Sequence, residues 1–153
     1  MIRVTYTTSR SLTGTHEPGD TVVIEFSAAQ PLTPGRKVSR DVQEAIGGHR
    51  ETLHHYGLRT WDVTTGPLLG AALEAVMEFL DSAEDGQTFD FEPWRYEIGP
   101  SLDLDFTTAR FRVAEEITCY LSSEGYSLSL LTAEGTGGAD DCYQLSFTVI
   151  ESP

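Results

Sequence analysis

Apolar and polar residues alternate along most of this chain, and a period of two is typical of β-strands with one buried face. The strands that this alternation predicts do not lie in one region but recur from the first residues to the last. The apolar members of the runs are Ile2, Val4 and Tyr6; Val22, Ile24 and Phe26; Phe89 and Phe91; Leu102, Leu104 and Phe106; Phe111, Val113, Ile117 and Cys119; Tyr126, Leu128 and Leu130; and Tyr143, Leu145, Phe147 and Val149. The pattern therefore predicts a mainly β protein.

A glycine pair in the first half of the chain marks a predicted hairpin. Val38, Val42 and Ile46 recur at even spacing up to Gly47-Gly48, which is a plausible tight turn. Residues 51–64 follow without proline and are rich in Thr, Tyr, Trp and Leu. We expect them to form the opposing strand of this hairpin.

One segment departs from the period of two and predicts a helix at about residues 67–82. Its apolar residues follow helical spacing and form one stripe, namely Leu69, Ala72, Leu73, Val76, Phe79 and Leu80. Pro67 suits a first helical position, Thr65 or Gly66 is the expected cap, and Gly86 follows the expected end. The fold class is thus mainly β (α+β), and a length of 153 residues fits a single domain over residues 1–153.

The charge is strongly negative and uneven. Ten basic residues stand against 24 acidic ones, which gives a formal charge of −14; residues 1–60 carry +1, residues 61–100 carry −8 and residues 101–153 carry −7. Nucleic-acid binding draws much of its affinity from Lys and Arg at the phosphates, so we expect no sequence-specific nucleic-acid binding. A neutral first part and an acidic remainder also suit attraction between neighbouring copies.

The sequence predicts no catalytic or cofactor site. His49, His54 and His55 are close together, with His16 as a further candidate ligand, but neighbouring residues of a strand point to opposite faces, which argues against a shared metal ion. The chain has no nucleophile elbow, no phosphate-binding loop and no zinc-protease helix motif. We therefore expect no enzyme activity, no metal and no cofactor, with a small metal-dependent enzyme kept as an alternative.

The two cysteines and the hydropathy exclude other classes. Cys119 and Cys142 match no zinc-site spacing, and we expect both to be reduced and buried. No apolar run approaches the roughly 20 residues of a membrane helix, and residues 1–6 lack the features of a signal peptide. The expected partners therefore include no membrane.

The order of motifs between residues 38 and 100 resembles one known family. Arg50-Glu51-Thr52-Leu53 precedes a strand that ends in Arg59-Thr60-Trp61-Asp62-Val63; the predicted helix follows with Phe79-Leu80 near its end, and then comes Gly86-Gln87-Thr88-Phe89-Asp90-Phe91. This order resembles the distal-tail and tail-tip (minor tail) proteins of long-tailed bacteriophages. The segment around Trp94 and the closing strand at residues 146–150 are also similar to that family.

The resemblance implies a small antiparallel β-sandwich or split barrel with one flanking helix and no catalysis. It implies self-assembly into a ring, commonly a hexamer, around the DNA channel near the tail tip. The implied location is the virion tail, assembled in the host cytoplasm, and the implied partners are the neighbouring tail tube and the tail-tip or hub proteins. Tail tube and terminator proteins share a similar plan and stay open as alternatives.

Two sets of residues are candidates for this role. Exposed aromatic and basic side chains of Trp94, Arg95 and Tyr96 are a candidate interface. The carboxylates of Asp103, Asp105, Asp140 and Asp141 are candidates for an acidic lumen that repels phosphate. A monomeric β-sandwich adaptor, using Trp94 and Tyr96 to hold a partner, is the main alternative to the ring.

Overall fold

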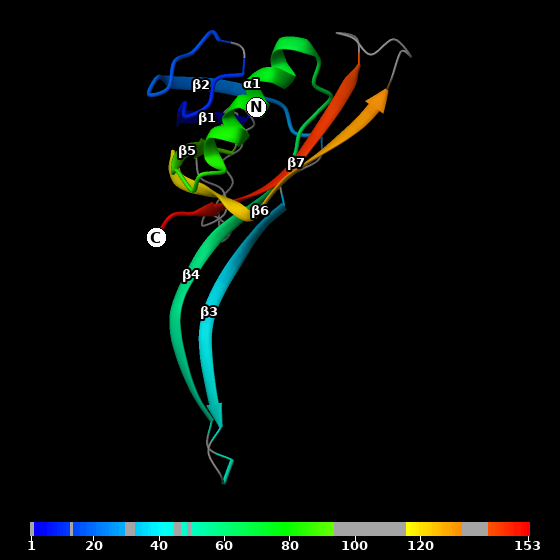
Figure 1. Cartoon of the computed structure of the whole chain (residues 1–153). Coiled ribbons are helices and arrows are strands. Elements are labelled where there is room, and N and C mark those ends of the chain that lie inside the picture. Colours follow the sequence, from blue (N-terminus) through cyan, green and yellow to red (C-terminus); the bar gives the residue numbers. More distant parts are fainter. Residues whose placement is uncertain are drawn as a thin grey trace, which may run out of the picture.

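The computed structural model describes residues 2–12, 14–29, 33–44, 47–48, 50–93, 116–132 and 141–153, and within them it gives the backbone alone for residues 33–34, 50–51, 53–56 and 132. Over these ranges the chain forms seven strands and one helix (Figure 1). The strands are β1 (Ile2–Thr7), β2 (Thr21–Phe26), β3 (Thr33–Glu44), β4 (Arg50–Thr64), β5 (Phe89–Glu92), β6 (Ile117–Thr132) and β7 (Cys142–Glu151), and the helix is α1 (Gly70–Ala83).

The strands form one antiparallel sheet in the order β2-β1-β5-β6-β7-β4-β3, which confirms the predicted mainly β fold with one helix. The sheet curls like an open barrel, because the segment after β2 meets the segment after β4. Ala28 bridges Thr65, and the Gly66 amide donates to the Ser27 carbonyl at 2.7 Å. The chain thus turns a corner from β2, which pairs with β1, into β3, which pairs with β4.

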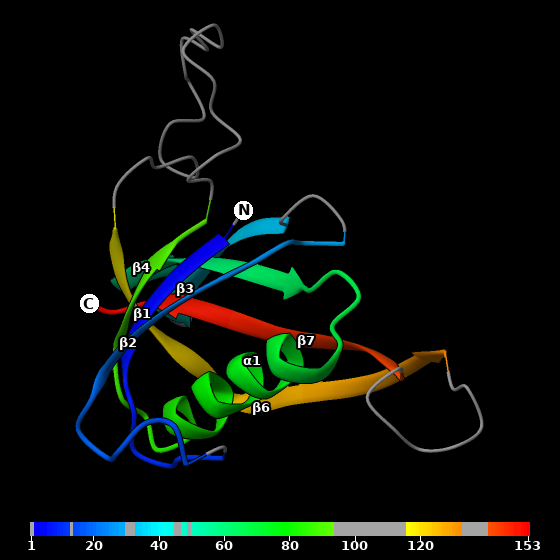
Figure 2. The same ribbon diagram turned by 90° about the horizontal axis from the view of Figure 1, so that it is seen from above.

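Alternation decides which side chains enter the core, as the sequence predicts. Ile2, Val4 and Tyr6 of β1 are buried, and their cross-strand partners on β2 are buried with them. One hydrophobic cluster joins these strands to β4, β5, β6, β7 and α1. Phe79 of α1 lies at its centre, with ring contacts to Tyr6, Phe89 and Phe147 at 4.8 to 6.1 Å between centroids. The helix therefore covers the concave face of the curled sheet (Figure 2).

Helix α1 begins at Gly70, about three residues later than the proline predicts. The reason is a backbone bridge: Leu68 and Tyr143 exchange both of their N–H···O=C bonds, at 2.8 and 3.0 Å, which holds Leu68 extended. Leu69, and not Thr65 or Gly66, is the N-cap, and it makes no side-chain cap bond. The helix ends at Ala83, and Gly86 follows at φ +82°, which glycine adopts without strain. Among the described helical residues there is no segment long and apolar enough to span a membrane.

The predicted hairpin around Gly47-Gly48 is confirmed, and it extends beyond the strands that pair with it. All of β3 pairs with β4, from Thr33 opposite Asp62 to Glu44 opposite Arg50, with one bulge beside Ser39. Strand β7 covers only residues 60–64 of β4. The remainder of the hairpin therefore leaves the body as a two-stranded ribbon (Figure 1).

Candidate functional site

The ribbon is the most distinctive surface of the molecule, and we call residues 36–44 and 50–59 the arm. At roughly 3.3 Å per residue its β3 side is about 30 Å long. Within the described ranges, no strand pairs with the outer edge of β3, and none but β3 pairs with β4 before Thr60. Open strand edges are templates for pairing with another chain, and an isolated two-stranded ribbon is only marginally stable in water.

The arm is exposed, apolar in part and basic. Val38 and Val42 are 48% and 42% exposed, and they are two of eight large hydrophobic residues that are exposed in the described part of the chain. Alternation places them on the same face as Arg36 and Arg40, while Lys37 lies on the opposite face.

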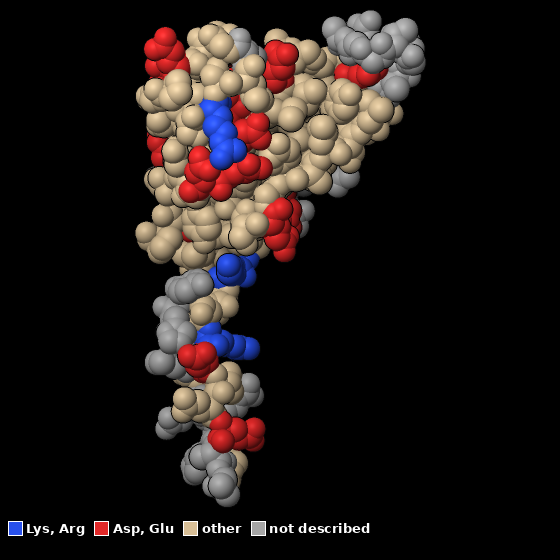
Figure 3. Space-filling view, viewed as in Figure 1, with Lys and Arg blue, Asp and Glu red and all other residues tan. Residues whose placement is uncertain are grey.

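The charge of the arm contrasts with that of the rest of the chain. Residues 33–59 contain five Lys or Arg and three Asp or Glu, against a total of −14 for the whole chain. Figure 3 shows the basic side chains along the upper part of the ribbon and acidic side chains over the body.

An ion pair fixes the root of the arm. Arg59 binds the carboxylate of Glu151 in a bidentate manner, with Nη2–Oε1 at 2.6 Å and Nε–Oε2 at 3.0 Å, and its backbone N–H also donates to Oε2 at 3.1 Å. The hydrogen bond from Arg59 holds the pKa of Glu151 below its usual range, against the opposing effect of burial. The guanidinium also lies 5.8 Å from the centroid of the buried Trp61 ring. The arm therefore leaves the body at a defined point.

A glycine lets a basic side chain cross the ribbon. Gly57 pairs with Val38, and a Cβ on Gly57 would lie 2.5 Å from Arg36 Nε and 2.6 Å from Nη2. The guanidinium of Arg36 thus lies directly over the backbone of Gly57. Any larger residue at position 57 has to displace Arg36.

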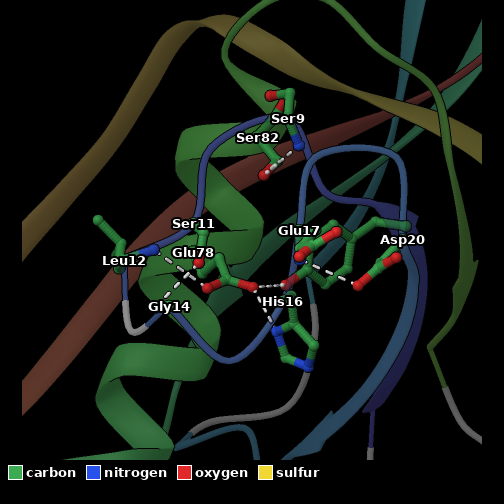
Figure 4. Close-up of polar contacts among 10 residues, drawn as sticks. Ser9, Ser11, Leu12, Gly14, His16, Glu17, Asp20, Glu78 and Ser82 are labelled. Atoms are coloured by element: carbon green, nitrogen blue, oxygen red, sulfur yellow. Dashed lines mark hydrogen bonds and ion pairs between the residues drawn. The ribbon is translucent and has the colours of Figure 1, made fainter.

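A second polar cluster ties the loop between β1 and β2 to the helix (Figure 4). The carboxylate of Glu78 is 2% exposed and receives hydrogen bonds from Tyr6 Oη at 3.2 Å and from the Leu12 backbone N–H at 3.2 Å. His16 Nδ1 lies 2.7 Å from Glu78 Oε1. Ser9 donates its backbone N–H to Ser82 Oγ, one helical turn further on.

At Glu78 the hydrogen bonds together outweigh the effect of burial on the carboxyl pKa. Burial alone would raise the pKa of Glu78, but the contacts with His16, Leu12 and Tyr6 together hold it below the ordinary value. The pKa of Tyr6 is raised, first by burial and then by the neighbouring Glu78 charge. The cluster fixes the loop between β1 and β2 to the helix.

Most of the residues that the sequence singles out fall outside the described ranges. This holds for Trp94, Arg95 and Tyr96 of the candidate interface and for Asp103, Asp105 and Asp140 of the candidate lumen. Asp141 is described; it precedes β7 and is only 7% exposed. The interface and the acidic lumen both stay predictions.

The histidines and cysteines are dispersed. His16 belongs to the Glu78 cluster, His49 lies outside the described ranges, and His54 and His55 are placed by backbone alone, with His55 the extra residue at the bulge. The described residues include no group of three or more His, Cys, Asp or Glu that could hold a metal. Both cysteines are free: Cys119 is buried, as expected, whereas Cys142 is only half-buried.

Comparison with known proteins finds similarity in structure. No protein-family model matches the chain, and no curated protein matches it. Among solved structures, the chain is similar to a chain of one described as the tail of an empty GTA particle, computed with helical refinement in C6 symmetry. The identity is 12%, the similarity covers 99% of this chain and 91% of that chain, and the TM-score is 0.42. A likeness of this size assigns no function, which has to be argued from the geometry of the chain.

Proposed function

We propose that this chain is a structural protein of a phage-type tail, and that the arm joins each copy to its neighbour. The observation that carries the proposal is the arm itself: a ribbon about 30 Å long with open edges, exposed valines and excess positive charge on an otherwise acidic protein. The motif order between residues 38 and 100, which resembles distal-tail and tail-tip proteins, supports the same role.

A contact made by the arm is heterologous, because a projecting ribbon on one copy meets a different surface on the next. Contacts of this kind close into a ring when the rotation between copies permits, and otherwise they form a filament. We propose closure into a ring, a hexamer by the family resemblance, formed by one domain of residues 1–153. The proposed location is near the tip of a virion tail, next to the tail tube and the tail-tip or hub proteins, with assembly in the host cytoplasm.

No catalytic step belongs to this proposal. The bidentate Arg59–Glu151 pair serves it by holding the arm at a fixed angle, and the Glu78 cluster serves it by stabilising the body. The acidic carboxylates at positions 103, 105 and 140 are proposed to face a channel through which DNA passes without sticking, whereas Asp141 is buried and is left out of this proposal.

The test compares the full chain with a variant whose arm is shortened. Val38 pairs with Gly57, so replacing residues 39–56 by Asn-Gly closes the ribbon with a two-residue turn and leaves residues 60–64 of β4 paired with β7. Light scattering coupled to size exclusion gives the mass of both proteins over a concentration series, alone and mixed with the neighbouring tail proteins.

We expect discrete multiples of 16.8 kDa for the full chain and a folded monomer for the shortened chain. A cooperative thermal transition, together with the helical circular dichroism signal of α1, shows that the shortened chain is folded. A full chain that stays monomeric in every mixture would contradict the ring and favour the adaptor. Equal assembly of both chains would show that the arm is not the contact.

A further inference from the structure

We propose that the arm of one copy docks in a specific groove on the body of the next copy, between the end of α1 and strand β6. This inference rests on the proposed function and names the surface that receives the arm. The groove has a volume of about 650 Å³ and is lined by residues 83–86 at the end of the helix and by residues 120–125 of β6. That volume accommodates several side chains of an entering strand.

The floor of the groove is an open strand edge. Strand β5 pairs with β6 only from Ile117 to Cys119, so in the described part of the chain the same edge of β6 has no strand partner from Tyr120 onward. The register with β7 shifts between Leu121 and Tyr126, and Gly125 lies at φ +70° within this bulge. Within the groove the regular open edge is short, at Tyr120 and Leu121, because residues 122–125 form the bulge. An entering strand therefore gains only a few main-chain hydrogen bonds there, and the charges of the rim make up the rest of the contact.

The rim of the groove favours cations. Glu84, Asp85 and Glu124 are exposed along it, and Arg10 pairs with Asp85 at 3.0 Å and with Glu84 at 3.7 Å. One guanidinium against three carboxylates leaves the rim net negative. The last turn of α1 contains no basic residue, so its carbonyl end also attracts positive charge.

A fourth carboxylate extends this negative surface along the helix. Asp81 accepts a hydrogen bond from Tyr126 Oη at 2.8 Å, so it lies beside the bulge of β6. Burial raises the pKa of Tyr126 to about 12, with further contributions from Asp81 and Glu84, as expected where negative charges gather.

The occupant that fits both the open edge of β6 and the negative rim is strand β3 of a second copy. It supplies an open edge for the main chain of β6, and it supplies Arg36 and Arg40 on one face and Lys37 on the other for the carboxylates of the rim. Asp41 and Glu44 of the same strand reduce its net charge to +1. The arm points away from its own body (Figure 1), so the groove receives the arm of another copy. Electrostatic complementarity of this kind sets register and partner choice more than affinity, because exposed ion pairs contribute little individually.

The experiment exchanges the charges of the two surfaces. The arm variant carries Lys37→Glu and Arg40→Glu. Arg36 is kept because its charge helps to lower the pKa of Glu151 at the root of the arm. The groove variant carries Asp85→Lys and Glu124→Lys. The control variant, Glu17→Lys with Glu74→Lys, changes the net charge as much as the groove variant but lies on exposed parts of the body outside the groove.

We expect each reversed variant alone to lose at least tenfold in the apparent association constant by sedimentation velocity, and the control variant to assemble like the original chain. Mixing the arm and groove variants restores assembly, because an acidic arm then meets a basic groove and a basic arm meets an acidic groove. Raising the salt concentration weakens the original assembly, since exposed charges are screened.

The outcomes separate the two proposals. If the groove variant assembles normally while the arm variant is monomeric, the groove is wrong and the role of the arm stands. If both reversed variants assemble normally, the role of the arm is wrong as well. The single changes Arg40→Glu and Glu124→Lys, both at exposed side chains, repeat the exchange should a double variant fail to fold.

Discussion

Arg59 and Glu151 form a bidentate ion pair at the root of the arm, with Nη2 and Oε1 only 2.6 Å apart. Glu151 is the last residue of β7, while Arg59 is the last residue of β4 before the segment that pairs with β7. The pair therefore joins the arm to the body just beyond the point where strand pairing stops.

The first prediction concerns this root. Arg59→Lys keeps the charge but loses the bidentate hydrogen bonding to Glu151. We expect it to lower the free energy of unfolding by about 1–2 kcal/mol, a modest amount because the pair is partly exposed. Hydrogen exchange in residues 36–44 should become faster than in the original chain. Lys37→Arg, an exposed change on the same arm, is the control, and equal exchange in both variants would show that the pair does not hold the arm.

The second prediction concerns acid stability. Because the pKa of Glu78 is lower in the folded chain than the ordinary 4.5, the ionised carboxylate stabilises the fold at neutral pH. This stabilisation decreases as the pH falls from about the ordinary carboxyl pKa through the lowered value.

Glu78→Gln tests this contribution. We expect the melting temperature to fall at pH 7, by the equivalent of about 1–3 kcal/mol, and to depend less on pH below 5 than in the original chain. Glu74→Gln, one turn earlier and exposed, should change neither property. An unchanged acid slope in Glu78→Gln would mean that other carboxylates control acid unfolding.

The third prediction contrasts two large apolar residues. Phe79→Ala removes the ring that contacts Tyr6, Phe89 and Phe147, and should cost about 3–5 kcal/mol in urea unfolding. Leu130→Ala truncates a side chain that is 52% exposed on β6 and should cost less than about 1 kcal/mol. Similar costs at both positions would mean that the end of β6 is covered in solution.

The fourth prediction concerns the thiols. Burial, with the negative charge of Glu151, raises the pKa of Cys119 to about 12, so its reactive thiolate is scarce at pH 8. Cys142 is half-buried at the start of β7. Mass spectrometry of the native protein under limiting iodoacetamide should find Cys142 alkylated first, and equal labelling would contradict the packing around β6.

Strands β1, β2, β5 and β7 and the helix were predictable because each follows one local period, whereas the strands predicted at residues 102–106 and 111–113 lie outside the described residues. Ile2, Val4 and Tyr6 alternate and are buried, and the apolar stripe from Leu73 to Leu80 matches α1. The start of the helix was not predictable from the sequence, because the extended conformation of Leu68 depends on Tyr143, a residue 75 positions later. Patterns of neighbouring residues cannot predict a pairing between residues so far apart in the sequence.

The helical pattern also does not predict that Glu78 is buried. It lies two residues after Val76, about 200° around the helix, which places it off the apolar stripe. The loop that contains Leu12 and His16 covers it, and only the folded chain brings this loop to the helix. The glycine pair and the long proline-free stretch did predict the hairpin, but not that β7 would leave most of it uncovered.

Strand β4 is shared between the body and the arm, and this sharing determines how the molecule carries load. Thr60, Trp61 and Asp62 are paired with β3 on one side and with β7 on the other. A tension applied along the arm therefore passes into the body through continuous backbone, and it loads the hydrogen bonds between β4 and β7 in shear, all at once. Bonds loaded in this way resist rupture together, whereas bonds peeled from one end break one after another. The arm therefore transmits a pulling force to the body without separating from it.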